Sequence, residues 1–366
     1  MNISVIGIGR LGLCMALCFE NNGCSVLGVD TNEEHVNQIN SKTLKSFEPK
    51  VEKYLQMSRK LKATTSLEKG LQFSNLIFIV VPTPSGQSDN YYDHSILIRL
   101  LSDINQFKIR NKHLVISCTV MPGFINKTGK DLLSDCEGCT LNYNPEFIAQ
   151  GSIINNFMRP DIVLIGEENK KAGDIIQSIY SSVSNCKKIH RLSVLEAEIT
   201  KISLNGFITT KIAYANLIGD LCLSLGLHSP NAVLAAIADD SRVGSKYFNY
   251  GYSYGGPCFS RDNHALSKCC SEVNLNASIP IATSISNQEH IQFQATQLLK
   301  ENKDEYIFTD ICYRPGSKIP IIDCSAKLKI AEILVRNHKK KVTIKDEPQL
   351  IDLVKKEYGN IFEYTT

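Results

Sequence analysis

A glycine motif near the start of the chain restricts the fold more than any other feature of the sequence. The motif begins within the apolar run ISVIGIG, at the end of an expected strand, and the next strand-like run, SVLGVD, ends at Asp30. Its glycines are Gly7, Gly9 and Gly12. Glycines at G-x-G-x-x-G spacing permit a tight strand-to-helix turn that a pyrophosphate can approach, and the later acidic residue accepts hydrogen bonds from ribose hydroxyls. The sequence therefore predicts a Rossmann-like dinucleotide site, with a tight turn that binds no dinucleotide as the alternative.

The residues around this motif favour NAD over NADP. Thr31 and Asn32 follow Asp30, and neither carries the positive charge that would accommodate a 2′-phosphate. Arg10 and Leu11 lie inside the motif, so we expect them to contact the cofactor as well.

The apolar pattern divides the chain into three parts. Short apolar runs first alternate with amphipathic stretches, which indicates a doubly wound parallel sheet with helices on both faces. The expected strands are ISVIGIG, SVLGVD, NLIFIVV, HLVISCTV, TLNYNPE and DIVLIG. We therefore expect an α/β protein with an NAD-binding Rossmann-like domain at 1–193. A central domain at 194–297, beginning with one long helix, and a shortened C-terminal α/β domain at 298–366 are expected to follow.

Composition excludes several classes of function. The formal net charge is only +3, so neither nucleic acid nor an anionic membrane is an expected partner. We find no apolar run that would span a bilayer and no signal-peptide pattern, and we expect a cytoplasmic protein. Cys136 and Cys139 form a C-x-x-C pair without a second pair at zinc-binding spacing, so we expect no metal site. Most of the 13 cysteines are interpreted as reduced core residues.

Polar residues and prolines follow three of the expected strands. Pro82 and Thr83 lie in VVPTP, Thr119 in SCTVMPG and Glu146 in NYNPEF. In an open parallel sheet, ligands bind beyond the carboxyl ends of the strands. We therefore expect these residues to line a cleft for nicotinamide and substrate, with ordinary turn chemistry as the alternative.

The later part of the sequence offers groups for covalent chemistry. Lys201 and Asn205 lie one turn apart on the long helix, where both could donate hydrogen bonds to one developing oxyanion. The run GYSYGGPCFSRD places the thiol of Cys258 near Asp262. With NAD, a thiol nucleophile suits oxidation of an alcohol to an acid through a thiohemiacetal and a thioester. The alternatives are a solvated Lys–Asn pair and a surface turn with an inert cysteine.

Taken together, the motifs resemble those of the UDP-glucose/GDP-mannose dehydrogenase family. In chain order they are GIGRLG, VPTP, SCTVMPG, NPEF, EAEITKISLN, DSRVG and GGPCFSRD. The resemblance implies NAD-dependent, four-electron oxidation of a nucleotide sugar at C6, with UDP-glucose as the first candidate. It also implies a homodimer built on the long helix.

The resemblance further implies individual roles. The implied catalytic residues are Cys258 as nucleophile, Lys201 and Asn205 as oxyanion donors, and Asp262, Thr119 and Glu146 as groups that position water or relay protons. Substrate contacts are implied for Glu146, Phe147, Gln150, Lys201, Asn205, Arg242, Tyr254, Gly255 and Arg314. Gly251, Gly255 and Gly256 would let the backbone wrap the sugar and present the thiol to C6.

Two departures from the family pattern keep other functions open. Gln150 stands where many members have a glutamate, and an amide cannot take a proton. The C-terminal part also reads as shorter than the family's third domain. The alternatives are a remodelled paralogue that binds NAD or nucleotide with little or no turnover, an oxidoreductase for UDP-N-acetylhexosamine or GDP-mannose, and a single-step β-hydroxyacid dehydrogenase. Cys258 in its glycine-rich run argues against the last.

Overall fold

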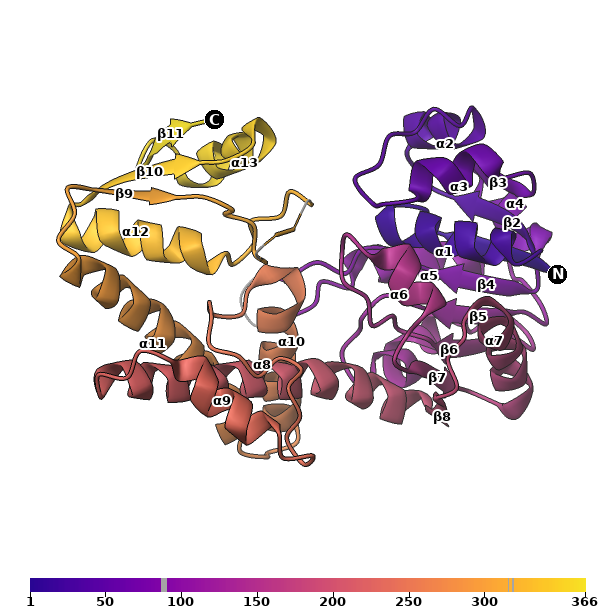
Figure 1. Ribbon diagram of the computed structural model, residues 1–366. Helices are drawn as coiled ribbons and strands as arrows, with labels where there is room; N and C mark the ends of the chain where they lie inside the picture. The colour runs from indigo at the N-terminus through magenta and orange to yellow at the C-terminus, as the bar shows by residue number, and fades with distance from the viewer. Residues whose placement is uncertain (87–90, 315, 318) are drawn as a thin grey trace. The chain divides into compact units, whose positions relative to one another are not determined.

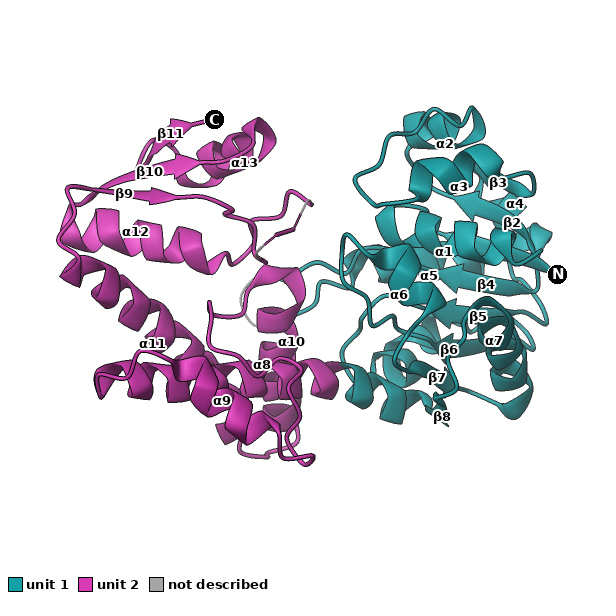
Figure 2. Ribbon diagram, in the orientation of Figure 1, with its two compact units in different colours: residues 1–201 teal, residues 202–366 magenta. Residues whose placement is uncertain are grey.

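The computed structural model describes residues 1–86, 91–314, 316–317 and 319–366 (Figure 1). The chain forms two compact units, Met1–Lys201 and Ile202–Thr366, and the division falls inside one long helix (Figure 2). Each unit has its own sheet.

The first unit is built on an eight-stranded sheet in the order β3-β2-β1-β4-β5-β6-β7-β8. Its strands are β1 (Asn2–Ile6), β2 (Ser25–Val29), β3 (Leu61–Thr64), β4 (Leu76–Ile79), β5 (His113–Ile116), β6 (Thr140–Tyr143), β7 (Val163–Glu167) and β8 (Ile189–Ser193). The order reverses between β1 and β4, as in a Rossmann-like sheet, and the six expected strands are all present.

Neighbouring strands of this sheet are parallel except at one position. β6 and β7 pair antiparallel through Tyr143 and Gly166, so β7 and β8 run opposite to the other six strands. The connection between β6 and β7 contains α6 (Ile153–Met158), a helix of 6 residues. Such a helix rises about 9 Å, which is less than the length of the strand it would have to run back along in a parallel crossover.

Helices cover both faces of this sheet, as a doubly wound fold requires (Figure 1). They are α1 (Arg10–Asn21), α2 (Glu33–Asn40), α3 (Val51–Met57), α4 (Leu67–Phe73), α5 (Ser95–Gln106), the short turns η1 (Ile125–Gly129) and η2 (Asp131–Leu133), α6, and α7 (Lys170–Val183). Because side chains alternate along a strand, Phe78 packs in the core beneath α1, whereas Ile77 and Ile79 pack in the core beneath α5. This alternation holds the carboxyl ends of the central strands in fixed positions.

The second unit consists of a helical part and a small α/β part. The long helix α8 (Val194–Ser224) passes from the first unit into the second, which continues with α9 (Pro230–Ala238), α10 (Gly256–Glu272) and α11 (Ser278–Lys300). The three-stranded parallel sheet, in the order β11-β10-β9, contains β9 (Glu305–Phe308), β10 (Lys341–Lys345) and β11 (Glu363–Thr365), with α12 (Ala326–His338) and α13 (Pro348–Tyr358). Ile291 and Ala295 of α11 share a core with this sheet.

Within the described residues, none of the helices combines the length and the apolar character that crossing a membrane requires.

Candidate functional site

The glycine motif forms a tight turn between β1 and α1. Gly7 has a φ of +88°, and a Cβ placed there would lie 2.5 Å from the carbonyl oxygen of Val80. A Cβ on Gly12 would lie 2.0 Å from the carbonyl oxygen of Gly7. At Gly9, by contrast, none of the described atoms lies within 4 Å of the Cβ position. The turn is therefore packed on its inner side and open at the N-terminus of α1, where an anionic pyrophosphate is stabilised.

The acidic end of β2 completes the dinucleotide site. Asp30 is half-buried directly after Val29, and its Oδ1 accepts a hydrogen bond of 3.0 Å from the backbone N–H of Asn32. Since a carboxylate has several acceptor positions, Asp30 keeps capacity for ribose hydroxyls. These residues fit NAD.

The loops after β4 and β5 meet, as their neighbouring positions in the sheet require. The Thr83 hydroxyl donates a hydrogen bond of 2.8 Å to the carbonyl oxygen of Thr119. Pro82 is exposed beside this contact. Thr83 and Thr119, which the sequence analysis identified in two different motifs, are therefore in direct contact.

Side chains that sequence reasoning missed also hold the Thr119 loop. Glu198 of α8 is fully buried, and its carboxylate accepts hydrogen bonds from Gly123 N–H at 2.6 Å and Ile125 N–H at 3.0 Å. The Met121 N–H donates to Nε2 of His94, whose pKa burial lowers to about 4. His94 is thus neutral and able to accept. No local motif marks these residues. The one available signal was that Glu198 lies one helical turn before Lys201, on the same face of α8.

Glu146 lies beyond the end of β6, where side chains of α7 and α8 contact it. Its Oε1 accepts a hydrogen bond from the Tyr180 hydroxyl of α7, and its backbone carbonyl accepts one of 2.7 Å from Nζ of Lys201. Removal of the carboxyl group from water raises the pKa of Glu146 to about 7, although the Tyr180 hydrogen bond and the Lys201 charge both oppose this shift. Glu146 can therefore take up or release a proton near neutral pH.

Lys201 is buried at this position, with 7% of its surface exposed. Its ammonium lies 4.5 Å from the centroid of the Phe147 ring. Contacts with a carbonyl and an aromatic face fix the direction of the ammonium group. Lys201, Glu146 and Phe147 therefore form one cluster.

Gln150 lies at the cofactor loop. Its Oε1 accepts a hydrogen bond from Nη1 of Arg10, at the start of α1. The amide thus holds an arginine next to the glycine motif, with no negative charge.

Cys258 lies in the first turn of α10 rather than in a flexible loop. All 13 cysteines belong to the described residues, and Cys258 is the one among them that is exposed. Nη2 of Arg261 lies 4.0 Å from its sulfur. The guanidinium and the N-terminus of the helix both stabilise negative charge on the sulfur.

Two of the glycines before Cys258 are required by packing within the second unit. A Cβ on Gly255 would lie 2.2 Å from the carbonyl oxygen of Cys324. Gly256 has a φ of +82°, and a Cβ there would lie 2.5 Å from the Tyr313 ring. These close approaches explain both glycines without a ligand. At Gly251, none of the described atoms lies within 4 Å of the Cβ position.

Amide and imidazole side chains hold the segment 250–254 that leads to Cys258. Asn287 accepts from Tyr254 N–H at 3.0 Å and donates to Tyr254 carbonyl oxygen at 3.1 Å. The Gly251 N–H donates to Asn216, while the Gly251 carbonyl oxygen lies 2.7 Å from Nε2 of His290. Side chains of α8 and α11 therefore form hydrogen bonds with this backbone that a neighbouring strand would otherwise supply. Sequence reasoning missed Asn216, Asn287 and His290, because they lie far from the cysteine in the chain.

Asp262 joins Asn205 and Arg261 in the second unit. The Asp262 carboxyl group is 1% exposed, accepts a hydrogen bond of 2.6 Å from Nδ2 of Asn205, and lies 3.6 Å from Nε of Arg261. An amide nitrogen carries two hydrogens, so Asn205 keeps a second one for another acceptor. Cys258, Arg261, Asp262 and Asn205 thus form a second cluster.

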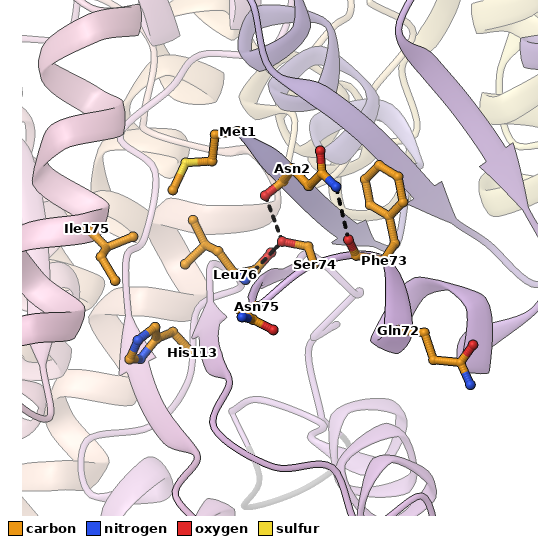
Figure 3. A pocket seen from close by; sticks show the side chains of 9 residues that line it. All are labelled: Met1, Asn2, Gln72, Phe73, Ser74, Asn75, Leu76, His113 and Ile175. Carbon is orange, nitrogen blue, oxygen red and sulfur yellow. Dashed lines mark hydrogen bonds between the residues drawn. The ribbon is translucent and has the colours of Figure 1, made fainter.

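The remaining expected residues lie outside these clusters. Arg242 is exposed and pairs with Asp240 at 2.7 Å. Tyr254 is buried, which raises its pKa to about 12. Arg314 is exposed. The hollow in Figure 3 is lined by residues that include Asn2, Leu76 and His113, the first residues of β1, β4 and β5. It therefore lies at the amino ends of the central strands, away from the carboxyl ends where the expected residues lie.

Comparison with known proteins relates both units to one family. Residues 1–184 match the NAD binding domain of the UDP-glucose/GDP-mannose dehydrogenase family, and residues 195–289 match the central domain of the same family. The first match agrees with the geometry of the glycine turn and Asp30, and the prediction of NAD as cofactor is confirmed.

Individual relatives differ in the sugar that their names state. The chain is 30% identical over 295 residues to UDP-glucose 6-dehydrogenase of Rickettsia conorii, which covers 79% of this chain and 67% of that protein. It is also 30% identical over 307 residues to GDP-mannose 6-dehydrogenase of Pseudomonas aeruginosa, which covers 80% and 69%.

Solved structures give the same picture. A UDP-glucose dehydrogenase from Pyrobaculum islandicum superposes with a TM-score of 0.90 at 25% identity, covering 100% of this chain and 86% of that one. A UDP-D-ManNAc dehydrogenase from Pyrococcus horikoshii superposes with a TM-score of 0.82 at 26% identity, covering 94% and 83%.

Proposed function

The chain belongs to the UDP-glucose/GDP-mannose dehydrogenase family, and on that premise we propose that it oxidises C6 of a nucleotide sugar from alcohol to carboxylate. UDP-glucose is the substrate we propose first, and the corresponding uronate is the product. The observation that carries this proposal is the exposed thiol of Cys258 in the first turn of α10, beside Arg261, the buried Asp262 and its hydrogen-bond partner Asn205. A thiol nucleophile is what a four-electron oxidation needs to hold its aldehyde stage.

The cofactor site follows from the glycine turn. We propose that Gly7, Gly9, Gly12 and the start of α1 hold the pyrophosphate of NAD and that Asp30 holds its adenosine ribose. When bound, NAD takes up a hydride from the sugar carbon in each of the two oxidations. Thr83 and Thr119 fix the two loops that follow β4 and β5.

Cys258 carries the covalent part of the proposed reaction. Its thiolate adds to the carbonyl carbon of the C6 aldehyde, which forms a C–S bond and a thiohemiacetal oxyanion. Loss of a hydride converts this species to a thioester. Attack by water then forms the carboxylic acid and breaks the C–S bond, so that the thiolate is regenerated.

Lys201 and Asn205 are the proposed oxyanion donors. The ammonium of Lys201 and the second amide hydrogen of Asn205 would donate hydrogen bonds to the negatively charged oxygen at C6. Lys201 is held by Glu146 and Phe147, and Asn205 by Asp262, so neither donor has to be reorganised during the reaction.

We assign the proton transfers to Glu146. A group whose pKa is about 7 can remove the proton from the C6 hydroxyl and later from the attacking water at neutral pH. Gln150 cannot accept a proton, and its contact with Arg10 gives it a place at the cofactor loop instead. Asp262 supports Asn205.

We propose further contacts for the nucleotide half of the substrate. Arg242 and Arg314 are exposed cations that would meet the phosphates or the base. Tyr254 and Gly255 would lie beside the sugar. The relatives act on different nucleotide sugars according to their names, so GDP-mannose and N-acetylated UDP-sugars are the other substrates to test.

We also propose that the protein is a homodimer through α8. Apolar side chains along this helix are exposed in the single chain, among them Phe207, Tyr214, Leu217 and Leu221. Residues 207, 214 and 221 are spaced by whole heptads and share one face of the helix. Exposed apolar stripes of this kind mark interaction surfaces.

A panel of nucleotide sugars tests the proposed function. Purified protein is mixed with NAD and, separately, with UDP-glucose, UDP-N-acetylmannosamine and GDP-mannose; NADH absorbance and the mass of the sugar product are followed. We expect a uronate from UDP-glucose.

Gln150, an amide at a position where a carboxylate is usual, motivates a second candidate, a remodelled paralogue that binds NAD without turnover. This candidate predicts NAD binding and no NADH with any sugar.

A further inference from the structure

We propose that Tyr180 is a positioning residue for Glu146, which orients its carboxylate and stabilises the ionised form through a hydrogen bond. The proposal rests on the function proposed above, in which Glu146 moves protons. It adds a residue of α7 that lies outside every motif of the sequence.

Tyr180 is held rigidly. The side chain is 2% exposed, and its ring centroid lies 5.4 Å from that of Phe157, which in turn lies 5.5 Å from that of Phe19. The hydroxyl at the end of this packed ring donates to Oε1 of Glu146. A donor on a locked aromatic ring fixes the direction of a carboxylate more strictly than a donor on a flexible chain.

Tyr180 acts as a donor throughout the pH range of the reaction. Burial and the neighbouring negative charge of Glu146 raise the pKa of the Tyr180 phenol well above its ordinary value, so the phenol keeps its proton. A hydrogen bond given to a carboxylate favours its charged form and lowers the pKa of the carboxyl group. The desolvation of Glu146 works in the opposite direction.

Two other titratable groups face Glu146 from the elements packed around it. Lys201 of α8 attracts the carboxylate and adds to the effect of Tyr180. Cys18 of α1 has its thiol pKa raised to about 12 by burial, so it is neutral and adds no charge. Tyr180 is therefore the neutral donor, and Lys201 the cation, that keep the pKa of Glu146 from rising further.

The replacement Tyr180→Phe removes the donor and keeps the packed ring. We expect the pKa of Glu146 to rise by on the order of one unit, so the acidic limb of the kcat–pH profile moves to higher pH. Turnover below this limb should fall about tenfold, whereas turnover on the alkaline plateau should stay close to wild type. Tyr54→Phe is the matched control, because Tyr54 is a half-buried tyrosine of the same unit whose hydroxyl faces Met158.

A titration that needs no turnover separates this inference from the proposed function. The carboxyl signal of Glu146 is followed by ¹³C NMR in glutamate-labelled protein and assigned by its loss in Glu146→Gln. We expect a midpoint near 7 in the wild type, since burial raises the pKa of Glu146 to about 7, and a higher midpoint in Tyr180→Phe. Site-specific 3,5-difluorotyrosine at position 180, a stronger donor, should move the midpoint down.

An unchanged Glu146 midpoint in Tyr180→Phe would overturn the inference, whether or not the protein is active. So would a kcat–pH profile that superposes on that of the wild type while activity is retained. Conversely, a wild-type protein that oxidises none of the nucleotide sugars would refute the proposed function, and the NMR titration would still decide the role of Tyr180.

Discussion

At the scale of residues, two carboxyl groups with different surroundings suit different tasks. Glu146 is desolvated and receives a hydrogen bond from Tyr180, and its pKa lies near 7. Asp262 is buried against Asn205 and the guanidinium of Arg261. A group that titrates near neutral pH can exchange protons with a substrate. A carboxylate that contacts an amide and an arginine serves instead to hold those two side chains in position.

Replacing the proposed nucleophile tests the covalent step. We expect Cys258→Ala to abolish uronate formation and to leave NAD binding nearly unchanged, because the glycine turn and Asp30 belong to the first unit. Product analysis and NAD titration measure the two effects. Cys269→Ala, on the same helix, is the matched control. Wild-type uronate formation in Cys258→Ala would rule out the covalent mechanism.

Removing the buried ammonium tests the oxyanion site. Lys201→Ala should lower kcat by about 10² to 10³, the size expected when one oxyanion donor is lost. Asn205→Ala should have a similar or smaller effect. Steady-state kinetics with saturating sugar provide the measurement. If both variants raise only KM and keep the wild-type kcat, these residues bind substrate without stabilising the oxyanion.

At the scale of elements, the backbone of the segment before Cys258 forms hydrogen bonds with side chains of α8, α9 and α11. Asn287 contacts both the N–H and the carbonyl of Tyr254, in the manner of a neighbouring strand. Because the segment enters α10 directly, its position sets the position of the thiol.

We therefore expect Asn287→Ala to lower kcat by about tenfold or more, since small displacements of a reacting group are costly. NAD affinity should stay at the wild-type value. The exposed neighbour Gln288→Ala is the control for changes on the same helix. The rate of Cys258 alkylation by iodoacetamide, read by mass spectrometry, reports on the thiol without turnover. If Asn287→Ala keeps the wild-type alkylation rate and the wild-type kcat, the segment keeps its position without the hydrogen bonds from Asn287.

The elements that sequence analysis predicted are those with strong apolar patterns. Six strands and the long helix were predicted correctly, because buried strands and a 31-residue helix leave long apolar runs. The strands β3 and β8 were missed. They lie at the two edges of the sheet, and their sequences LKAT and IHRLS are half-exposed and carry charges. The reversal of β7 and β8 depends on the path of the chain around α6, which no local pattern reveals.

In the candidate site as well, local features were predictable from the sequence and contacts between distant residues were not. The glycine turn was predicted because its spacing and its steric reason are both local. Contacts such as Tyr180–Glu146 and Asn287–Tyr254 join residues 34 and 33 positions apart, and only the fold brings them together. Packing also gives two glycines near Cys258 a reason that the sequence could not show, because Gly255 and Gly256 pack against Cys324 and Tyr313.

At the scale of the whole molecule, α8 is the element that both units share. Its first turns carry Glu198 and Lys201 of the first unit, and Asn205 follows in the second. Beyond Asn205 the same helix exposes Phe207, at 67%, and Leu221, at 52%. One helix therefore carries the proposed oxyanion donors and the proposed dimer surface.

The dimer proposal predicts a change of mass. Wild-type protein should sediment as a dimer in analytical ultracentrifugation, and Leu217→Asp/Leu221→Asp should shift it to the monomer, because charges cannot be buried in an apolar interface without cost. Met57→Asp places one such charge on an apolar residue of the first unit that is at least as exposed, and it should leave the dimer intact. A wild-type monomer at micromolar concentration would contradict the proposal.

The most direct test of the central claim is the number of NADH molecules formed for each molecule of UDP-glucose consumed. A limiting, weighed amount of the sugar is incubated with purified protein and excess NAD, and NADH absorbance is read at completion alongside mass spectrometry of the product. Two successive hydride transfers through a Cys258 thioester predict two NADH and one UDP-glucuronate per sugar. One NADH with an accumulating aldehyde, or no NADH at all, would contradict the account.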